Sequence, residues 1–143
     1  MKKLSFDSIV RRLSETDIPR ADLVIGISRG GTVPAALVAY RIDAPLRLMR
    51  ISFRGPGNET LYAEPEVKSA PALDGDVKTV LLVDDVSITG ATLAAARKCY
   101  KQVKTVTLVF RGEADCVLFP EIKGCVEWPW KDGVGPTEAT GRE

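Results

Sequence analysis

Histidine is absent from this sequence of 143 residues, and cysteine occurs only three times. The absence of histidine excludes a Ser-His-Asp triad, a Cys-His dyad and any zinc site with a histidine ligand. Acid–base chemistry must therefore come from Asp, Glu, Lys, Tyr or the substrate itself. Cys99, Cys116 and Cys125 are odd in number and show no Cys-x-x-Cys spacing, which favours reduced thiols over a disulfide framework.

The sequence also lacks an excess of charge of one sign and a long apolar run. Twenty basic and 19 acidic side chains leave a net charge of +1, so there is no global basic field for nucleic acid. No apolar run approaches the ~20 residues that span a membrane, and polar residues follow residues 1–4 where a secretory signal has an apolar core. We therefore expect a cytoplasmic protein without nucleic-acid or membrane partners.

Short apolar segments alternate along the chain with segments of helical spacing, which predicts an α/β fold. The sheet should be mainly parallel and twisted, with helices on both faces and right-handed crossovers. We place one domain at residues 1–132 and predict a flexible tail at residues 133–143, which are rich in Gly, Pro, Thr and Glu. Residues 54–76 show no regular pattern and are predicted to form a lid or a disordered segment. The expected strands are 23–27, 46–53, 80–83, 105–110, 116–119 and 124–128, and the expected helices are 6–13, 32–41 and 93–100.

Residues 80–92, Val-Leu-Leu-Val-Asp-Asp-Val-Ser-Ile-Thr-Gly-Ala-Thr, are the most informative segment. Four apolar residues lead into Asp84 and Asp85, and a turn of small and hydroxylic residues then precedes a helix. This pattern predicts a buried parallel strand that brings two acids to its carboxyl end, beside a helix N-terminus. Such a corner suits a ligand with hydroxyls and a phosphate, because carboxylates accept hydrogen bonds from hydroxyls. Free backbone N–H groups and the hydroxyls of Thr89 and Thr92 would hold the phosphate.

Residues 28–31, Ser-Arg-Gly-Gly, follow another expected strand and open an expected helix. Glycine lets backbone N–H groups approach an anion closely, and Arg29 adds a charged, forked donor suited to phosphate. Because ligands of parallel sheets bind outside the carboxyl ends of the strands, we assign this loop and residues 84–92 to one site. Two simpler alternatives are a common glycine turn for the first loop and a strand that ends in Asp-Asp by chance for the second.

The acidic pair and the Thr-Gly-x-Thr turn, in register behind an apolar strand, resemble the signature of the type I phosphoribosyltransferases. Residues 28–31 resemble the pyrophosphate-binding loop of the bacterial and archaeal xanthine-guanine phosphoribosyltransferases. The resemblance implies the type I phosphoribosyltransferase fold with a small C-terminal hood. It also implies transfer of ribose 5-phosphate from phosphoribosyl pyrophosphate (PRPP) to a nucleobase, with a purine favoured, release of pyrophosphate and use of Mg²⁺.

The same resemblance implies roles for individual residues. Asp84 and Asp85 would hold the ribose hydroxyls and the metal ion, and would oppose positive charge that grows on the ribose. Residues 54–71 match the position of the flexible loop that closes over the reaction in this family. The residues implied to bind pyrophosphate are Ser28, Arg29, Gly30 and Gly31, with a cis peptide bond between the first two. Those implied to bind the 5-phosphate are Val86, Ser87, Ile88, Thr89, Gly90, Ala91 and Thr92.

Residues 125–131 resemble the purine-binding hood of the same subfamily, in which an aromatic ring stacks on the base. The resemblance implies that Cys125, Val126 and Trp128 contact the base. A second interpretation stays open, because two tryptophans beside a proline also suit a hydrophobic plug at a chain end.

Three residues depart from the pattern of the subfamily. Ile88 stands where an aspartate often handles the purine proton, Cys125 replaces the stacking aromatic residue, and Lys131 replaces an acid. Each change falls on base recognition or activation, and none falls on PRPP binding. Two alternatives therefore stay open: a non-catalytic PRPP- or nucleotide-binding regulatory protein, and an enzyme that acts on an unusual amine or base. The apolar helix at residues 35–40 suits either a homodimer interface or a core face.

Overall fold

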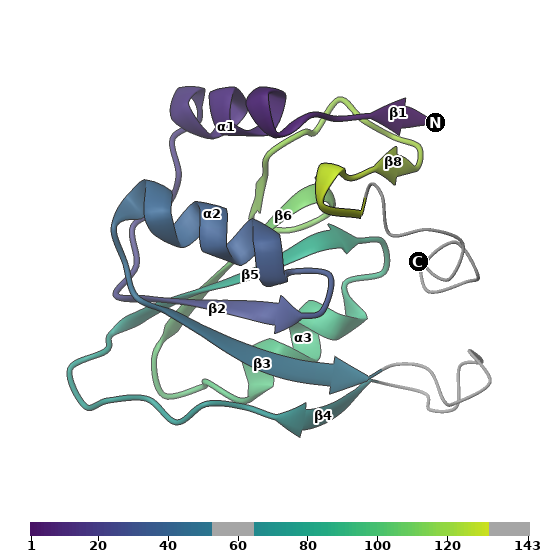
Figure 1. Ribbon diagram of the computed structural model, residues 1–143. Coiled ribbons are helices and arrows are strands. Elements are labelled where there is room, and N and C mark those ends of the chain that lie inside the picture. The colour runs from purple at the N-terminus through teal and green to yellow at the C-terminus, as the bar shows by residue number, and fades with distance from the viewer. Residues whose placement is uncertain (53–64, 132–143) are drawn as a thin grey trace.

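A six-stranded sheet forms the centre of the protein, with the strand order β4-β3-β2-β5-β6-β7 (Figure 1). Neighbouring strands are parallel, except that β4 runs antiparallel to β3. The computed structural model describes residues 1–52 and 65–131. The elements are β1 (Lys2–Lys3), α1 (Phe6–Glu15), β2 (Leu23–Ser28), α2 (Thr32–Ile42), β3 (Leu46–Ser52), β4 (Glu66–Ser69), β5 (Thr79–Ser87), α3 (Ala91–Lys98), β6 (Lys104–Gly112), β7 (Cys116–Val117), β8 (Val126–Glu127) and a 3₁₀ turn (Pro129–Lys131).

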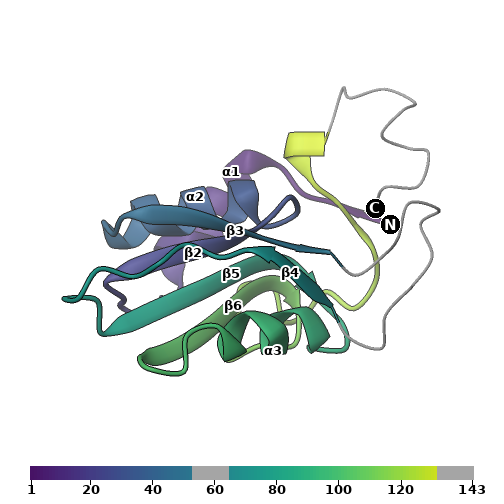
Figure 2. The same cartoon turned by 90° about the horizontal axis from the view of Figure 1, so that it is seen from below.

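The sheet lies between two layers of helices. Figure 2 shows α1 and α2 on one face and α3 on the other. Strand β5 is central, and its first apolar stretch is covered on both faces, as a parallel strand between helices should be. Its fully buried residues are Val80, Leu81, Leu82 and Val83, each 0% exposed. The predicted α/β fold with a mainly parallel sheet and helices on both faces is thus confirmed.

Helix α1 begins with a reciprocal cap. The Oγ of Ser5 accepts the N–H of Ser8 at 3.1 Å, and the Oγ of Ser8 accepts the N–H of Ser5 at 3.2 Å. Ile9 and Leu13 then point into the core. The helix is tied to α2 by Arg41, whose Nε donates to the carbonyl of Leu13 at 3.0 Å. Local capping and the apolar stripe together fix where this helix starts and which face it buries.

The apolar residues of helix α2, at 35–40, were expected to form either a homodimer interface or a core face. Ala35, Val38 and Ala39 are buried against the sheet, so the core explains most of the apolar character of this segment. Tyr40 points away and is 90% exposed. The apolar face of α2 is therefore used inside the domain.

The structure corrects several of the expected elements. The helix expected over 93–100 is α3 at Ala91–Lys98, and the strand expected over 116–119 covers only Cys116–Val117. Residues 66–69 fall inside the stretch predicted to be irregular, but they form β4 and pair with the edge of β3. The strand expected over 80–83 continues to residue 87, because β5 keeps its register with β6 beyond the acidic pair. The strand expected over 124–128 covers only residues 126–127, and it pairs with β1 in a separate two-stranded sheet rather than with the main sheet.

Most of the predicted loop over residues 54–71 lies outside the described residues. The whole of the predicted tail over residues 133–143 lies outside them as well. Within residues 1–52 and 65–131, no helix combines the length and the apolar character that crossing a membrane requires.

Candidate active site

The candidate site lies where β2 and β5 end, at the carboxyl edge of the sheet (Figure 1). The paired register of these two strands runs to Gly26 opposite Val83. Beyond this pair the two strands no longer pair with each other, although β2 continues beside β3 to Ser28 and β5 continues beside β6. The loop at residues 28–31 follows β2, and the acidic pair belongs to β5 itself, which continues to Ser87. The topology thus brings together the two segments that the sequence assigned to one site.

Two glycines hold these segments in direct contact. A Cβ on Gly30 would lie 2.6 Å from Oδ1 and 2.9 Å from Cγ of Asp85. A Cβ on Gly31 would lie 2.5 Å from the carbonyl oxygen of Val83 and 3.0 Å from Cα of Asp84. Real side chains do not approach this closely, so only glycine allows the loop to pack on the acidic pair. The loop and the pair therefore form one continuous surface.

The peptide bond between Ser28 and Arg29 is cis, which confirms the expectation drawn from the resemblance. The hydroxyl of Ser28 donates to the carbonyl of Met49 at 3.1 Å and ties the start of the loop to β3. Arg29 follows with an exposed side chain. The loop thus presents backbone groups and one guanidinium at the rim of the acidic pair, a combination suited to an anion.

The two acids of the pair lie next to each other in a partly buried environment. Asp84 is only 9% exposed, and its Oδ1 accepts the backbone N–H of Asp85 at 2.8 Å. Asp85 repeats the arrangement, with Oδ1 accepting the N–H of Val86 at 2.8 Å. Burial raises the pKa of Asp84 well above its ordinary value, and the neighbouring charge of Asp85 raises it further. A ligand or ion that brings positive charge to this pair is therefore favoured electrostatically.

The turn at residues 88–92 leads from β5 into α3. Gly90 has a φ of 83° and is the N-cap residue of α3, where it has no side chain to accept an N–H of the first turn. The Oγ of Thr89 accepts the N–H of Ala91 at 3.2 Å and shapes the turn. Ile88 is 62% exposed, an unusual position for an isoleucine. The turn has the uncapped amides that an anion such as phosphate can use.

Sequence analysis missed the end of β6, which the structure places beside this site. Arg111 pairs in register with Val86, and its Nη2 donates to the carbonyl of Lys123 at 2.7 Å. The Nε of Arg111 is buried and has no acceptor among the described residues. Gly112 follows, packed on the peptide of Ser87. The strand was expected to end at residue 110, but polar residues just after a parallel strand next to the acidic pair were an available signal.

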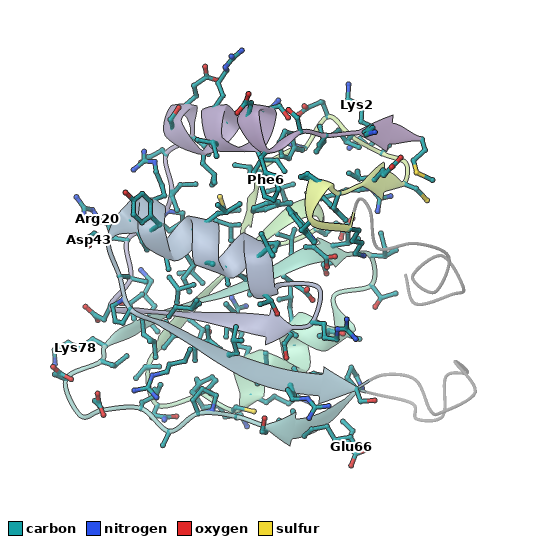
Figure 3. All side chains as sticks on the ribbon, in the orientation of Figure 1. Lys2, Phe6, Arg20, Asp43, Glu66 and Lys78 are labelled. Atoms are coloured by element: carbon teal, nitrogen blue, oxygen red, sulfur yellow. The ribbon has the colours of Figure 1, made fainter. Side chains whose placement is uncertain are left out.

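The hood is built differently from the expected base pocket. Trp128 is 3% exposed, and its ring stacks on Trp130 with centroids 5.1 Å apart and planes inclined by 8°. Phe110 meets the edge of Trp128, with ring centroids 5.9 Å apart. Phe6 lies on α1 (Figure 3), and its ring centroid is 6.2 Å from that of Trp130. This packing agrees with the alternative of a hydrophobic plug.

The buried position argues against Trp128 as an accessible stacking ring, because the two indoles would have to separate before a base could enter between them. Of the other two residues assigned to the base, Cys125 is exposed and Val126 is half-buried in β8. The carbonyl of Cys125 accepts the N–H of Lys2 at 3.2 Å, so β1 holds this part of the hood.

Comparison with known proteins shows similarity to phosphoribosyltransferases. Residues 6–131 match the model of the phosphoribosyl transferase domain family. The chain is 40% identical over 81 residues to the orotate phosphoribosyltransferase of Saccharolobus solfataricus, with 56% of this chain and 36% of the relative covered. It is 29% identical over 112 residues to the xanthine-guanine phosphoribosyltransferase of Ruegeria sp., with 75% and 64% covered. The chain thus spans 36% and 64% of the lengths of these curated relatives.

A solved structure shows the same architecture. The xanthine-guanine-hypoxanthine phosphoribosyltransferase of Helicobacter pylori superposes with a TM-score of 0.75 at 14% sequence identity, and the match covers 90% of this chain and 92% of that one. The fold is therefore that of the type I phosphoribosyltransferases. With the family model matched over residues 6–131, the chain belongs to the phosphoribosyl transferase domain family.

Proposed function

We propose that this protein transfers the 5-phosphoribosyl group of PRPP to a ring nitrogen of a nucleobase and releases pyrophosphate. The bond between ribose C1 and a pyrophosphate oxygen breaks, and the oxygen keeps the electron pair. The base nitrogen forms the new bond to C1 and loses its proton to solvent or to the departing pyrophosphate. The products are a nucleoside monophosphate and pyrophosphate, so the reaction salvages a preformed base.

One observation carries this proposal: the glycines of the loop at residues 28–31 pack directly on the acidic pair. In PRPP, the pyrophosphate is attached to the ribose carbon next to the one that bears the 2-hydroxyl. A ribose whose hydroxyls meet Asp84 and Asp85 therefore needs an anion-binding group in immediate contact with these acids. The spacing of 2.6 Å between a Cβ on Gly30 and Oδ1 of Asp85 shows how close the loop lies. A separate glycine turn and a solvated strand end would not need this contact.

The charges suit the proposed transition state. Positive charge grows on the ribose as pyrophosphate leaves, and two carboxylates at its hydroxyl side oppose that charge. Asp84 lies in a buried environment, where electrostatic interactions are stronger than in water. Arg29 and the backbone groups of its loop would hold the opposite charge on the pyrophosphate. In this proposal the two segments stabilise the two charges that separate as the bond breaks.

Asp84 and Asp85 fit a magnesium ion that arrives with its substrate. Within the described ranges, no three His, Cys, Asp or Glu side chains gather into a metal site. Mg²⁺ takes oxygen ligands and commonly combines one or two carboxylates with substrate phosphates. The raised pKa of Asp84 reflects burial and the charge of Asp85, which a cation beside the pair would offset. When bound, the ion would neutralise charge on the leaving pyrophosphate.

We propose a purine as the acceptor, on the basis of the similarity to the xanthine-guanine relative. The end of β6 offers a donor for it, because the buried Nε of Arg111 has no acceptor among the described residues. Its N–H would suit an exocyclic oxygen of a base once the side chain turns outward, because the atom is closed to ligands in the structure as described. Ile88 cannot take a proton, so the acceptor nitrogen must lose its proton without help from this side chain.

The same observation favours a second candidate function. The exposed, apolar Ile88 belongs to a turn that keeps the features of a phosphate site. A protein that binds PRPP or a nucleotide without turnover, as a regulator, would have this combination.

The two functions differ in whether pyrophosphate is released. Purified protein is mixed with PRPP, Mg²⁺ and a panel of purine and pyrimidine bases, and pyrophosphate is measured. Release with one class of base supports the enzyme, whereas PRPP binding without release on any base supports the regulator. The Asp85→Asn variant should lower turnover by about 10²–10³-fold, because a preorganised charge facing the developing cation is lost. Unchanged turnover in that variant would exclude the proposed role of Asp85.

A further inference from the structure

The end of β6 makes an unusually close contact with the start of the turn at residues 88–92. Gly112 has a φ of 112°, a conformation that side chains rarely adopt. A Cβ at this position would collide with the carbonyl oxygen of Ser87, and it would lie 2.8 Å from the carbonyl carbon and 2.9 Å from the nitrogen of the same residue. These are backbone atoms, which cannot rotate away as a flexible side chain would. Glycine is therefore required here both by conformation and by space.

The residue after Gly112 completes the contact. The N–H of Glu113 donates to the carbonyl of Ser87 at 2.8 Å. Ser87 is 8% exposed and pairs in register with Gly112 as the last pair of the two strands. The peptide that leads into the turn is thus held on one side by the close approach of Gly112 and by a hydrogen bond from Glu113.

The middle of the turn has little support of its own. Ile88 is 62% exposed, and a Cβ on Gly90 would meet no atom within 4 Å. At its far end, the turn is anchored through α3, where Leu93 is buried. The position of the turn is therefore set by the residues on either side of it. Ser87 precedes the turn and lies against β6, and α3 follows the turn.

We infer that Gly112 is a positioning residue that holds the 5-phosphate-binding turn in place through the peptide of Ser87. This inference rests on the proposed function, because it concerns the turn assigned to the 5-phosphate of PRPP. A side chain at position 112 would displace Ser87 and move the amides of the turn. It would leave the loop at residues 28–31 in place, because that loop packs on Val83 and the acidic pair instead.

This difference between the two loops provides the test. Gly112→Ala is compared with wild type and with Gly75→Ala, a matched control whose added Cβ meets no atom within 4 Å. Binding of ribose 5-phosphate and of pyrophosphate is measured separately by titration calorimetry in the presence of Mg²⁺. We expect Gly112→Ala to bind ribose 5-phosphate about tenfold more weakly than the control, and pyrophosphate within about twofold of it. Equal binding of ribose 5-phosphate, or an equal loss for both ligands, would overturn the inference.

A measurement on wild-type protein covers the case in which Gly112→Ala does not fold. Hydrogen exchange of the Glu113 amide reports opening of its bond to Ser87. Ribose 5-phosphate should slow this exchange more than pyrophosphate does, and an unchanged rate would overturn the inference. If wild-type protein binds neither ribose 5-phosphate nor PRPP, the proposed function fails, and the inference fails with it. If wild type binds and Gly112→Ala binds equally, only the role of Gly112 is lost.

Discussion

Replacing Gly30 with alanine tests the contact on which the proposed function depends. Gly30 is not among the described glycines with positive φ, so its backbone accepts an alanine and the effect is one of space alone. The added Cβ would lie 2.6 Å from Oδ1 of Asp85, whereas ordinary contacts begin at 3.4 Å. The carboxylate must therefore retreat by roughly 0.8 Å or break its bond to the N–H of Val86. A misplacement of about 1 Å at a catalytic group costs about 10²-fold in rate, or ~2.7 kcal/mol in the barrier.

The assay is pyrophosphate release at saturating PRPP and Mg²⁺, with whichever base the wild-type protein accepts. Gly30→Ala should lower kcat by about 10²-fold relative to Gly75→Ala, with a similar thermal midpoint because the change lies at the ligand-binding rim. Asp85 is the affected group, so the double variant Gly30→Ala/Asp85→Asn should be little slower than Asp85→Asn alone. If Gly30→Ala keeps kcat within about threefold of the control, then the packing of the loop on Asp85 is not important for turnover.

Three further predictions concern stability and the acceptor. Burial and the charge of Asp85 raise the pKa of Asp84 in the folded state above its value in the unfolded state. Between these two pKa values the folded state binds more protons than the unfolded state. The free energy of unfolding therefore falls as the pH rises from the unfolded-state value to the folded-state value. Asp84→Asn should remove this fall and raise the free energy of unfolding at neutral pH, as measured by urea denaturation at several pH values; an unchanged pH profile would contradict the assignment. Trp128→Ala should lower the free energy of unfolding by about 3–5 kcal/mol in the same measurement, because it leaves a cavity where a buried ring stacks on Trp130. A loss below about 1 kcal/mol would indicate that the ring is not part of the core and is available to bind a base. Arg111→Ala should raise the KM for the base by about tenfold or more and leave the KM for PRPP unchanged in steady-state assays, and the reverse pattern would place Arg111 on the phosphate side.

The sequence was most informative at residues 80–92, where a single strand and the turn after it contain the acidic pair and the expected phosphate-binding residues. Four apolar residues before Asp84 predict burial on both faces, and the acids are brought to the sheet edge by that strand alone. The contact between the acids and the loop at residues 28–31 follows from a rule of parallel sheets rather than from any spacing in the sequence. Local features thus sufficed for the fold class, and the rule for parallel sheets added the proximity of these two segments.

Long-range packing could not be predicted in the same way. The strand over residues 66–69 contains one apolar residue, Val67, and exists because β3 offers it an antiparallel partner. The pairing of β1 with β8 joins residues 2–3 with residues 126–127, which lie near opposite ends of the described chain. Burial of Trp128 depends on Phe110 and Trp130, which approach it only in three dimensions. The place of Arg111 beside the acidic pair depends on the register of β6 with β5, which continues to Gly112.

The two outer strands of the main sheet have a consequence for how copies of this protein can meet. One outer strand, β7, has two residues, and the other, β4, has four and carries Glu66 and Lys68 joined by an ion pair of 3.2 Å (Figure 3). A very short strand such as β7 and a strand with charged side chains such as β4 are poor templates for adding a foreign strand, which is the usual first step in sheet-driven aggregation. Crowded solutions of the folded protein should therefore resist fibre formation that starts at β4 or β7.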